Sequence, residues 1–379
     1  MDFSLSKTEE LFLQMVREFA EKEVKPLAAQ VDEEEMYPEE TVKKMAKLGL
    51  LGIPIPKQYG GAGGTNVMYG MAVEEVSRVC ATTGVILSSH TSLCCAPIME
   101  NGTEEQKQKY LPKLASGEWL GAFALTEPGA GTDAAGQQTT AVLDGDQWVL
   151  NGSKIFITSG SYADVFVVIA MTDKSLGTKG ISAFIVEKGT PGFTVGKKEK
   201  KMGLRGSATT ELIFQDCRIP KENLLGVMGK GFGIAMKTLD GGRIGIASQA
   251  LGIAQGAMDE TIKYTKERKQ FGKSISQFQN TQFQMADLET KVQAARLLVR
   301  CAHYKKDHGM PYTADAAMAK LFCAETAMEV TTKAVQVHGG YGYTREYPVE
   351  RMMRDAKITE IYEGTSEVQR MVIAGKLFK

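Results

Sequence analysis

The first third of the chain has apolar and polar positions spaced with the period of an α-helix. Between residues 11 and 27 apolar side chains recur every three or four positions, while Arg, Glu and Lys fill the opposite face. The apolar positions are Leu11, Phe12, Met15, Val16, Phe19, Ala20, Val24 and Leu27. Pro38 and the two acidic residues after it predict the start of a second helix, which ends at Gly49. Residues 1–120 are therefore expected to form a helical domain.

The pattern changes to short β-rich runs near Gly121. The runs cover residues 140–143, 148–150, 155–158, 165–170, 181–186, 193–195 and 211–214. Asp144-Gly145 and Asn151-Gly152 separate the first three runs, and both dipeptides predict hairpin turns. The runs follow one another too closely for helical crossovers between parallel strands. We therefore expect a central antiparallel β domain over residues 121–226.

The last part of the chain returns to the helical period. Long helical patterns cover residues 234–268, 281–308 and 313–338, and a shorter one ends near residue 376. Gly309 and Pro311 separate the second pattern from the third. Residues 227–379 are expected to form a C-terminal helical bundle. The whole chain is then an α+β protein in which the elements occur in the order α, β, α.

Composition excludes some classes of partner. The 45 basic residues balance 45 acidic residues in a chain of 379, so no overall positive field favours nucleic acid. The N-terminal ten residues carry four charges and do not resemble a secretory signal, and no apolar run approaches the roughly 20 residues that span a bilayer. The six cysteines lack the spacing of a zinc or redox motif. We expect a soluble, cytoplasmic protein with no metal site and with reduced thiols.

Two partial nucleotide-binding motifs fail in their context. Gly129-Ala130-Gly131 begins a loose G-x-G-x-x-A match, but Pro128 precedes it and a β pattern, not a helix, follows. Residues 272–274 resemble the end of a P-loop, but Glu267 occupies the position of the required first glycine. A dinucleotide would therefore bind this chain without the usual parallel-sheet cradle.

Glu363 is the main candidate for chemistry. It follows the apolar pair Ile361-Tyr362 and precedes Gly364, after which residues 365–367 resemble the start of a helix. A glutamate held against apolar surface has a raised pKa, which suits a general base near neutral pH. Gly364 lets a ligand approach the backbone closely. The alternative is a solvated loop carboxylate in front of a helix, and the local sequence by itself favours that alternative.

Three other segments admit either a binding role or a plain structural one. The loop at residues 125–133 is dense in hydroxyls and glycines; it either offers donors to a polar ring or phosphate, or simply connects two elements. Gly339-Gly340 ends a long helix as a binding turn or as a glycine cap. Arg268 is either a phosphate clamp or a charge that stabilises a helix end.

Taken together, these segments resemble the acyl-CoA dehydrogenase family, and the resemblance covers essentially the whole chain. The matching motifs lie at residues 125–133, 154–158, 267–272, 336–340 and 361–365. Each is moderately specific alone, and their joint order and spacing is far more so. The resemblance implies an N-terminal helical domain, a central β domain and a C-terminal four-helix bundle, which agrees with the pattern of the chain.

The resemblance also implies a bound FAD between the β domain and the bundle. The positions that match contacts to the flavin are Phe123, Leu125, Thr126, Thr132, Phe156, Ile157 and Thr158. The positions that match contacts to the pyrophosphate and adenosine, largely from a neighbouring subunit, are Arg268, Gln279, Gln336, Gly339 and Gly340. Thr365, Ser366 and Glu367 also match cofactor contacts. A homotetramer built as a dimer of dimers is implied.

In the same resemblance, Glu363 matches the base that removes the α-proton of an acyl thioester. A minority of the family, the isovaleryl and long-chain types, carry this glutamate on an earlier helix, at the position that Gly242 occupies here. That difference supports Glu363 and disfavours an isovaleryl substrate. Asp240, Arg243 and Gly364 match residues on the substrate side of the site.

The implied activity is the α,β-dehydrogenation of a short-chain acyl-CoA, butyryl-CoA to crotonyl-CoA, or the same reaction in reverse. The chain resembles the bacterial short-chain enzymes of the family most closely. An electron-transferring flavoprotein is the implied redox partner, because the sequence has no second redox motif. The alternatives are a medium- or branched-chain dehydrogenase, an acyl-CoA oxidase, or a non-catalytic scaffold that binds flavin or acyl-CoA.

Overall fold

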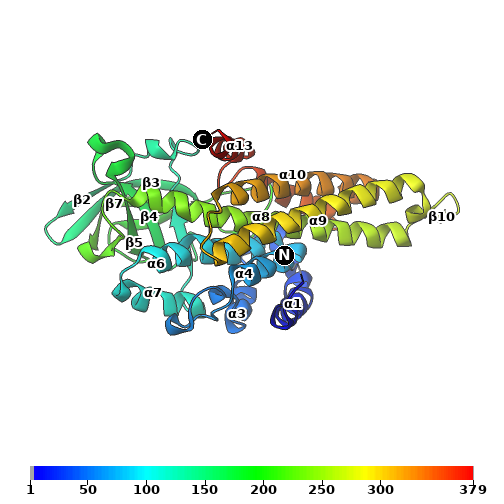
Figure 1. The fold of residues 1–379 in the computed structure, drawn as a ribbon, viewed down its shortest axis with the longest axis horizontal. Helices are drawn as coiled ribbons and strands as arrows, with labels where there is room; N and C mark the ends of the chain where they lie inside the picture. The colour runs from blue at the N-terminus through cyan, green and yellow to red at the C-terminus, as the bar shows by residue number, and fades with distance from the viewer. Residues whose placement is uncertain (1–3, 379) are drawn as a thin grey trace.

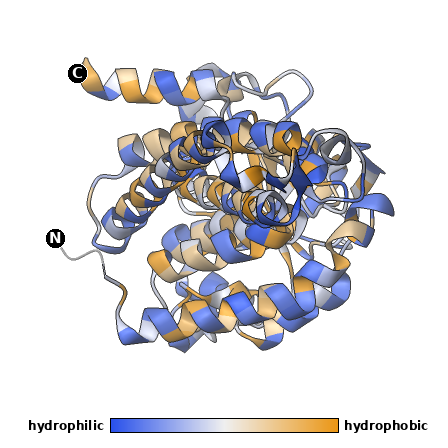
Figure 2. Cartoon of the chain, turned by 90° about the vertical axis from the view of Figure 1, so that its right-hand side faces the viewer, coloured by the Kyte–Doolittle hydropathy of each residue, from blue (hydrophilic) through white to orange (hydrophobic). Residues whose placement is uncertain are grey.

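The computed structural model describes residues 4–378, which form three parts in chain order. In Figure 1 the sheet lies at one end, the N-terminal helices lie along one side, and three long helices extend to the other end. This is the predicted succession of a helical, a β and a second helical part. Figure 2 shows hydrophilic and hydrophobic residues alternating along the outer helices, as expected for amphipathic helices.

The N-terminal part begins with a capping box at Ser6. Its first helical stretch is interrupted rather than continuous, because Pro26 has no N–H to donate to the preceding turn. The predicted apolar stripe is buried at Val16, Phe19 and Val24, whereas Leu11 is 55% exposed. The helices of this part are α1 (Lys7–Phe19), α2 (Ala28–Glu33), α3 (Glu39–Lys47), α4 (Asn66–Val79), α5 (Ala81–Ser89), α6 (Ala96–Asn101) and α7 (Glu104–Ser116).

The β part is one sheet in the order β6-β7-β3-β2-β4-β5-β8, with β1 beside β4. Its strands are β1 (Gly121–Ala124), β2 (Thr140–Asp144), β3 (Gln147–Ile157), β4 (Val165–Met171), β5 (Ile181–Glu187), β6 (Phe193–Lys198), β7 (Thr210–Pro220) and β8 (Leu224–Leu225). Most pairs are antiparallel as predicted. The prediction is wrong for β4, which pairs in parallel with β1 and, through Thr140 and Met171 alone, with β2. The long loop and the β2–β3 hairpin that separate β1 from β4 allow these two strands to run in the same direction.

The two turn dipeptides of the β part have different structures. Asp144-Gly145 forms the predicted hairpin between β2 and β3, with a φ of 61° at Gly145. The hairpin predicted at Asn151-Gly152 is wrong, because β3 continues through it and a shift of register between Leu150 and Gly152 marks a β-bulge. A Cβ on Gly152 would lie 2.7 Å from the Cα of Thr139. Close approach of a neighbouring strand, rather than chain reversal, therefore requires this glycine.

The C-terminal part is built on α8 (Gly231–Glu267), α9 (Gln279–Asp307) and α10 (Thr313–His338), each within three residues of its predicted range. The short hairpin β9 (Lys269–Gln270) and β10 (Lys273–Ser274) joins the first two of these helices. Small buried side chains, among them Ala250, Ala254 and Ala327, let the helices pack closely. The elements α11 (Gly340–Tyr343), α12 (Val349–Lys357) and α13 (Ser366–Leu377) complete the chain. No helix of residues 4–378 is apolar enough over its length to cross a membrane.

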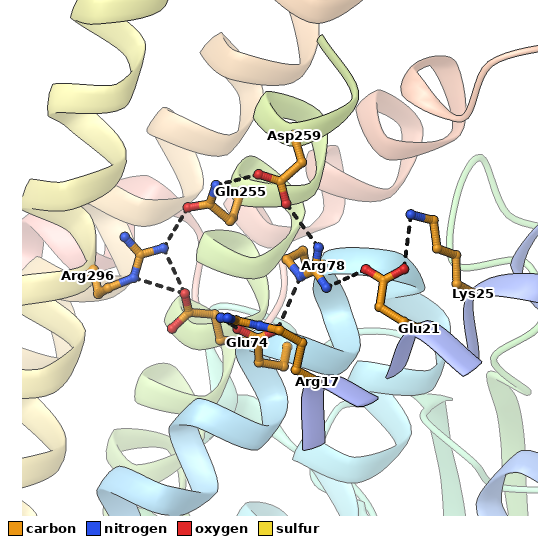
Figure 3. A network of polar contacts seen from close by, with 9 residues as sticks. Arg17, Glu21, Lys25, Glu74, Arg78, Gln255, Asp259 and Arg296 are labelled. Carbon is orange, nitrogen blue, oxygen red and sulfur yellow. Dashed lines mark hydrogen bonds and ion pairs between the residues drawn. The ribbon is translucent and has the colours of Figure 1, made fainter. Parts of the chain in front are cut away.

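A polar network joins the N-terminal helices to the bundle (Figure 3). Arg78 of α4 donates to Glu21 at 2.6 Å and to Asp259 of α8 at 3.0 Å. Arg296 of α9 donates to Glu74 of α4 at 2.8 Å. Because Arg78, Arg296 and Glu74 are largely shielded from water, each must find a partner, and the pairing fixes the two helical parts against each other.

Candidate active site

Glu363 lies on a strained turn just before α13. Its φ is 53° and that of Gly364 is 94°, so two consecutive residues are in the left-handed region. For a glutamate this conformation costs free energy and persists only where neighbouring groups hold it. The Gln369 side chain donates to the Gly364 carbonyl at 2.8 Å, and Lys320 of α10 donates to the same oxygen at 2.8 Å. Thr365 caps α13 by accepting from the N–H of Val368.

The carboxylate of Glu363 is buried against α8. Its Oε2 has no solvent contact and no hydrogen-bond partner among the described residues, although the residue as a whole keeps some exposure. A Cβ on Gly242 would lie 2.1 Å from this oxygen, so a glycine is required there. Burial raises the pKa of Glu363 to about 8, against the opposing charges of Lys320 and Arg243. The alternative of a solvated loop carboxylate is therefore wrong.

Two further candidates lie one helical turn apart on α8 beside this base. Arg243 donates to Asp240 at 2.7 Å, and Thr313 of α10 donates to the other carboxylate oxygen of Asp240 at 2.7 Å. Nε of Arg243 lies 3.5 Å from the backbone carbonyl oxygen of Glu363. The structure thus brings together Asp240, Arg243, Glu363 and Gly364, as the sequence predicts for one site.

The loop after β1 is anchored by a buried ion pair. Lys154 of β3 is 0% exposed, and its Nζ donates to the Leu125 carbonyl at 2.9 Å and to Glu127 at 2.7 Å. The Glu127 carboxylate also accepts from the backbone N–H of Thr139 at 3.0 Å. Burial lowers the pKa of Lys154 to about 8, although Glu127 opposes this shift. Both residues stand inside the motifs noted in the sequence, but sequence reasoning missed their pairing because the two motifs are separated along the chain.

Family models match all three parts of the chain. They describe the N-terminal, middle and C-terminal domains of acyl-CoA dehydrogenase and match residues 6–118, 122–217 and 229–378. The chain belongs to the acyl-CoA dehydrogenase family. It is 65% identical, over the full length of both chains, to the short-chain specific acyl-CoA dehydrogenase of Clostridium acetobutylicum.

Solved structures agree with this family assignment. Butyryl-CoA dehydrogenase from Megasphaera elsdenii superposes with a TM-score of 0.98 at 52% identity, over all of both chains. A second solved chain has a TM-score of 0.99 at 57% identity, also over all of both chains. It is described as "Electron transferring flavoprotein of Acidaminococcus fermentans: Towards a mechanism of flavin-based electron bifurcation". Acyl-CoA dehydrogenases are flavin-dependent.

Of the candidate flavin contacts, several present free groups on the rim of the β domain. Phe156 is 60% exposed and has a φ of 58°. Thr126 and Thr158 are partly exposed, and their hydroxyls bond to no other described residue. By contrast, Leu125 and Ile157 are buried in the protein, so they can offer a ligand only their backbone. Phe123 is half-buried and Thr132 is exposed.

The candidates for the far end of the cofactor do not reach Glu363 within one chain. Arg268 and the Gly339-Gly340 turn line one open pocket of about 570 Å³ at the C-terminal end of α8. This end lies beside the β9–β10 hairpin, opposite the β domain (Figure 1). Gln279 and Gln336 are exposed and do not line that pocket. Within a single chain, the two groups of cofactor candidates therefore lie far apart.

The start of α13 adds polar groups close to the base. Oγ of Ser366 and Oε1 of Gln369 are buried without hydrogen-bond partners among the described residues, whereas Glu367 is exposed. Buried polar atoms are normally paired, so several unpaired atoms beside Glu363 indicate a surface that receives a polar ligand. Sequence reasoning missed Gln369, because its role depends on the turn that it stabilises.

Proposed function

We propose that this protein catalyses the FAD-dependent α,β-dehydrogenation of a short-chain acyl-CoA, butyryl-CoA to crotonyl-CoA, and that the reaction can run in reverse. The observation that carries the proposal is the buried, unpartnered Oε2 of Glu363 against Gly242. The names of two relatives support a short acyl chain as the substrate. They are the short-chain specific enzyme of C. acetobutylicum and the butyryl-CoA dehydrogenase of M. elsdenii.

Glu363 acts as the base that removes the α-proton of the thioester. With a pKa raised to about 8, its carboxylate is a stronger base than an ordinary glutamate and holds the proton after transfer. Its backbone N–H donates to no acceptor among residues 4–378, so it is free to bind the thioester oxygen. Such a donor stabilises the developing enolate by roughly 3 kcal/mol. Asp240, Arg243 and Gly364 form the substrate side of the same site.

The residues on the rim of the β domain fit FAD. The free hydroxyls of Thr126 and Thr158 and the exposed ring of Phe156 together offer hydrogen bonds and an apolar face to a flavin ring. When bound, FAD supplies the acceptor for the hydride that leaves the β-carbon. The chain's own part is to hold the acyl group between that face and Glu363, an orientation worth several kcal/mol.

The proposed assembly is a homotetramer. In a single chain Arg268, Gln279 and the Gly339-Gly340 turn lie far from Glu363, and a neighbouring copy would bring such residues to the cofactor. Light scattering coupled to size exclusion tests this proposal: a monomer that retains FAD and full activity would contradict it. The proposed redox partner is an electron-transferring flavoprotein, and the proposed location is the cytoplasm.

The experiment that tests the proposed base is Glu363→Gln. We expect the variant to retain FAD and to lose turnover by roughly 1,000-fold, because the amide cannot accept the α-proton. Glu360→Gln is the matched control, since Glu360 lies on the adjoining turn and pairs with Lys357 at the surface. Substantial turnover in Glu363→Gln would contradict the assignment. Turnover of longer or branched thioesters in preference to butyryl-CoA would keep the base and change the substrate.

A further inference from the structure

Lys320 is a fully buried lysine that has no part in the proposed removal of the α-proton or in the binding of FAD. It lies in the middle of α10 and is 0% exposed. Its Nζ donates to the Gly364 carbonyl at 2.8 Å, and no ion pair to it occurs among residues 4–378. The other fully buried lysine, Lys154, has the Glu127 carboxylate at 2.7 Å. Burying an ammonium without a carboxylate in contact is costly, so a compensating function is expected.

The carbonyl that Lys320 binds belongs to the turn that carries Glu363. The left-handed φ values of 53° and 94° at Glu363 and Gly364 cannot be maintained by the turn alone. Gln369 of α13 donates to the Gly364 carbonyl at 2.8 Å and to the Glu363 carbonyl at 3.3 Å. Lys320 adds a charged donor from a different helix. The direction of the carboxylate toward Gly242 therefore depends on α10 as well as on α13.

Few charges face the Glu363 carboxylate from the elements around it. Arg243 and Asp240 of α8 neutralise each other in a 2.7 Å ion pair. Two tyrosine hydroxyls complete the surroundings, and both donate elsewhere: that of Tyr69 on α4 to Ser88, and that of Tyr362 to Gln249. Lys320 is thus the one described cation near the base that is not paired with another carboxylate.

The electrostatic effects of the pair agree with this geometry. Burial raises the pKa of Glu363, and among the opposing charges Lys320 lowers it more than Arg243 does. Burial lowers the pKa of Lys320 to about 8, and the negative charge of Glu363 opposes that shift. Glu360 and Glu367 also act on Lys320, but more weakly than Glu363.

We infer that Lys320 is a positioning residue for the base: it fixes the Glu363–Gly364 turn through the Gly364 carbonyl and supplies the positive charge that favours the ionised carboxylate. The inference rests on the proposed role of Glu363. It assigns Lys320 no contact with substrate or cofactor. Without this charge, Glu363 holds its proton to higher pH, and less of the enzyme has a base ready to accept the α-proton.

The test compares Lys320→Met, Lys320→Gln and Lys320→Arg with the wild-type holoenzyme. The first readout is kcat/KM for butyryl-CoA against pH, which reports ionisation in the free enzyme. The second is independent of turnover: difference infrared spectroscopy of the carboxylic-acid C=O band that disappears in Glu363→Gln, followed against pH. Lys201→Met is the matched control, because Lys201 is a half-buried lysine that, like Lys320, donates to a backbone carbonyl, that of Ser207 at 2.6 Å.

We expect both midpoints to rise by roughly one pH unit in Lys320→Met and Lys320→Gln. Lys320→Arg should restore them toward the wild-type value, and Lys201→Met should leave them unchanged. If Lys320→Met does not fold, Lys320→Gln gives the same test, because it can still donate a hydrogen bond but has no charge. An unchanged infrared midpoint in a folded neutral variant would overturn the inference. A shifted infrared midpoint together with an active Glu363→Gln enzyme would instead reject the proposed role of Glu363 as the base, and would leave only the effect of Lys320 on the ionisation of Glu363.

Discussion

At the scale of single residues, the site depends on a glycine and a glutamate that occupy complementary space. Glu363 can bury its carboxylate only because Gly242 has no side chain. The motif around Glu363 was sufficient to propose this residue as the base. It could not predict that the carboxylate is buried, because the burial comes from α8 and α10, which are distant in the sequence. Lys320 gave no signal for the same reason: within its helix it is one charged residue among several.

Gly242→Ala tests this complementarity. The added Cβ would lie 2.1 Å from Oε2 of Glu363 and 2.7 Å from Cδ2 of Leu93, so the carboxylate must move. A displacement of about 1 Å at a reacting group costs roughly 100-fold in rate, and we expect a loss of kcat of that size. Gly233→Ala is the control on the same helix, since a Cβ there meets nothing within 4 Å. Equal kcat values for the two variants would contradict the account.

Glu363 should also make stability depend on pH. Its pKa is 4.5 in the ordinary state and about 8 in the folded protein, so the folded state binds this proton more tightly. Stability therefore falls as pH rises from 4.5 toward 8, and the cost is complete above 8. We expect Glu363→Gln to be more stable than wild type at pH 9, by roughly 5 kcal/mol, and nearly equal to it at pH 4.5. Chemical denaturation at both pH values measures this difference; a constant difference would be inconsistent with a raised pKa.

At the scale of elements, the loop after β1 owes its shape to β3. The sequence predicted strands β2 to β7 and the long helices α8, α9 and α10, because periodicity depends on local residues. It failed at Asn151-Gly152 and at β1, where the structure depends on which strand lies alongside. The anchoring of residues 125–133 by Lys154 likewise arises only when β1 and β3 are placed together.

Lys154→Met should loosen this loop and leave the Glu127 carboxylate buried without its cationic partner. Breaking one side of a buried pair costs about 3–5 kcal/mol, so we expect a large loss of stability and weaker retention of FAD. The double variant Lys154→Met/Glu127→Gln also removes the unpaired charge of Glu127 and should recover part of the stability. Urea unfolding and titration of the apoprotein with FAD measure the two effects. A double variant that is less stable than Lys154→Met would show that the charge pair is not the anchor.

At the scale of the whole molecule, the site forms where two long helices of the C-terminal part and the turn before α13 meet. α8 supplies Gly242 and Arg243, α10 supplies Lys320, and the turn before α13 supplies Glu363. The network of Figure 3 holds the N-terminal helices against the same bundle through Arg78 and Arg296. The relative placement of such parts leaves no periodic trace in the sequence, which is why only the resemblance to a family could predict it.

Arg78→Met tests the connection between the two helical parts. The change leaves Glu21, Glu75 and Asp259 without their shared guanidinium partner, and we expect a loss of roughly 3 kcal/mol in the free energy of unfolding. Lys43→Met removes an exposed lysine from surface pairs with Glu39 and Glu40, and its melting temperature should stay close to that of wild type. Similar melting temperatures for the two variants would argue that the network contributes little.

The central claim is that Glu363 initiates the oxidation of a short acyl thioester in a flavin-dependent enzyme. An anaerobic titration of the purified protein with butyryl-CoA, followed by its visible spectrum, tests that claim most directly. We expect a yellow flavin band that bleaches as butyryl-CoA is added to the wild type and persists in Glu363→Gln. A band that bleaches equally in both proteins, or that responds to no acyl-CoA in the wild type, would contradict it.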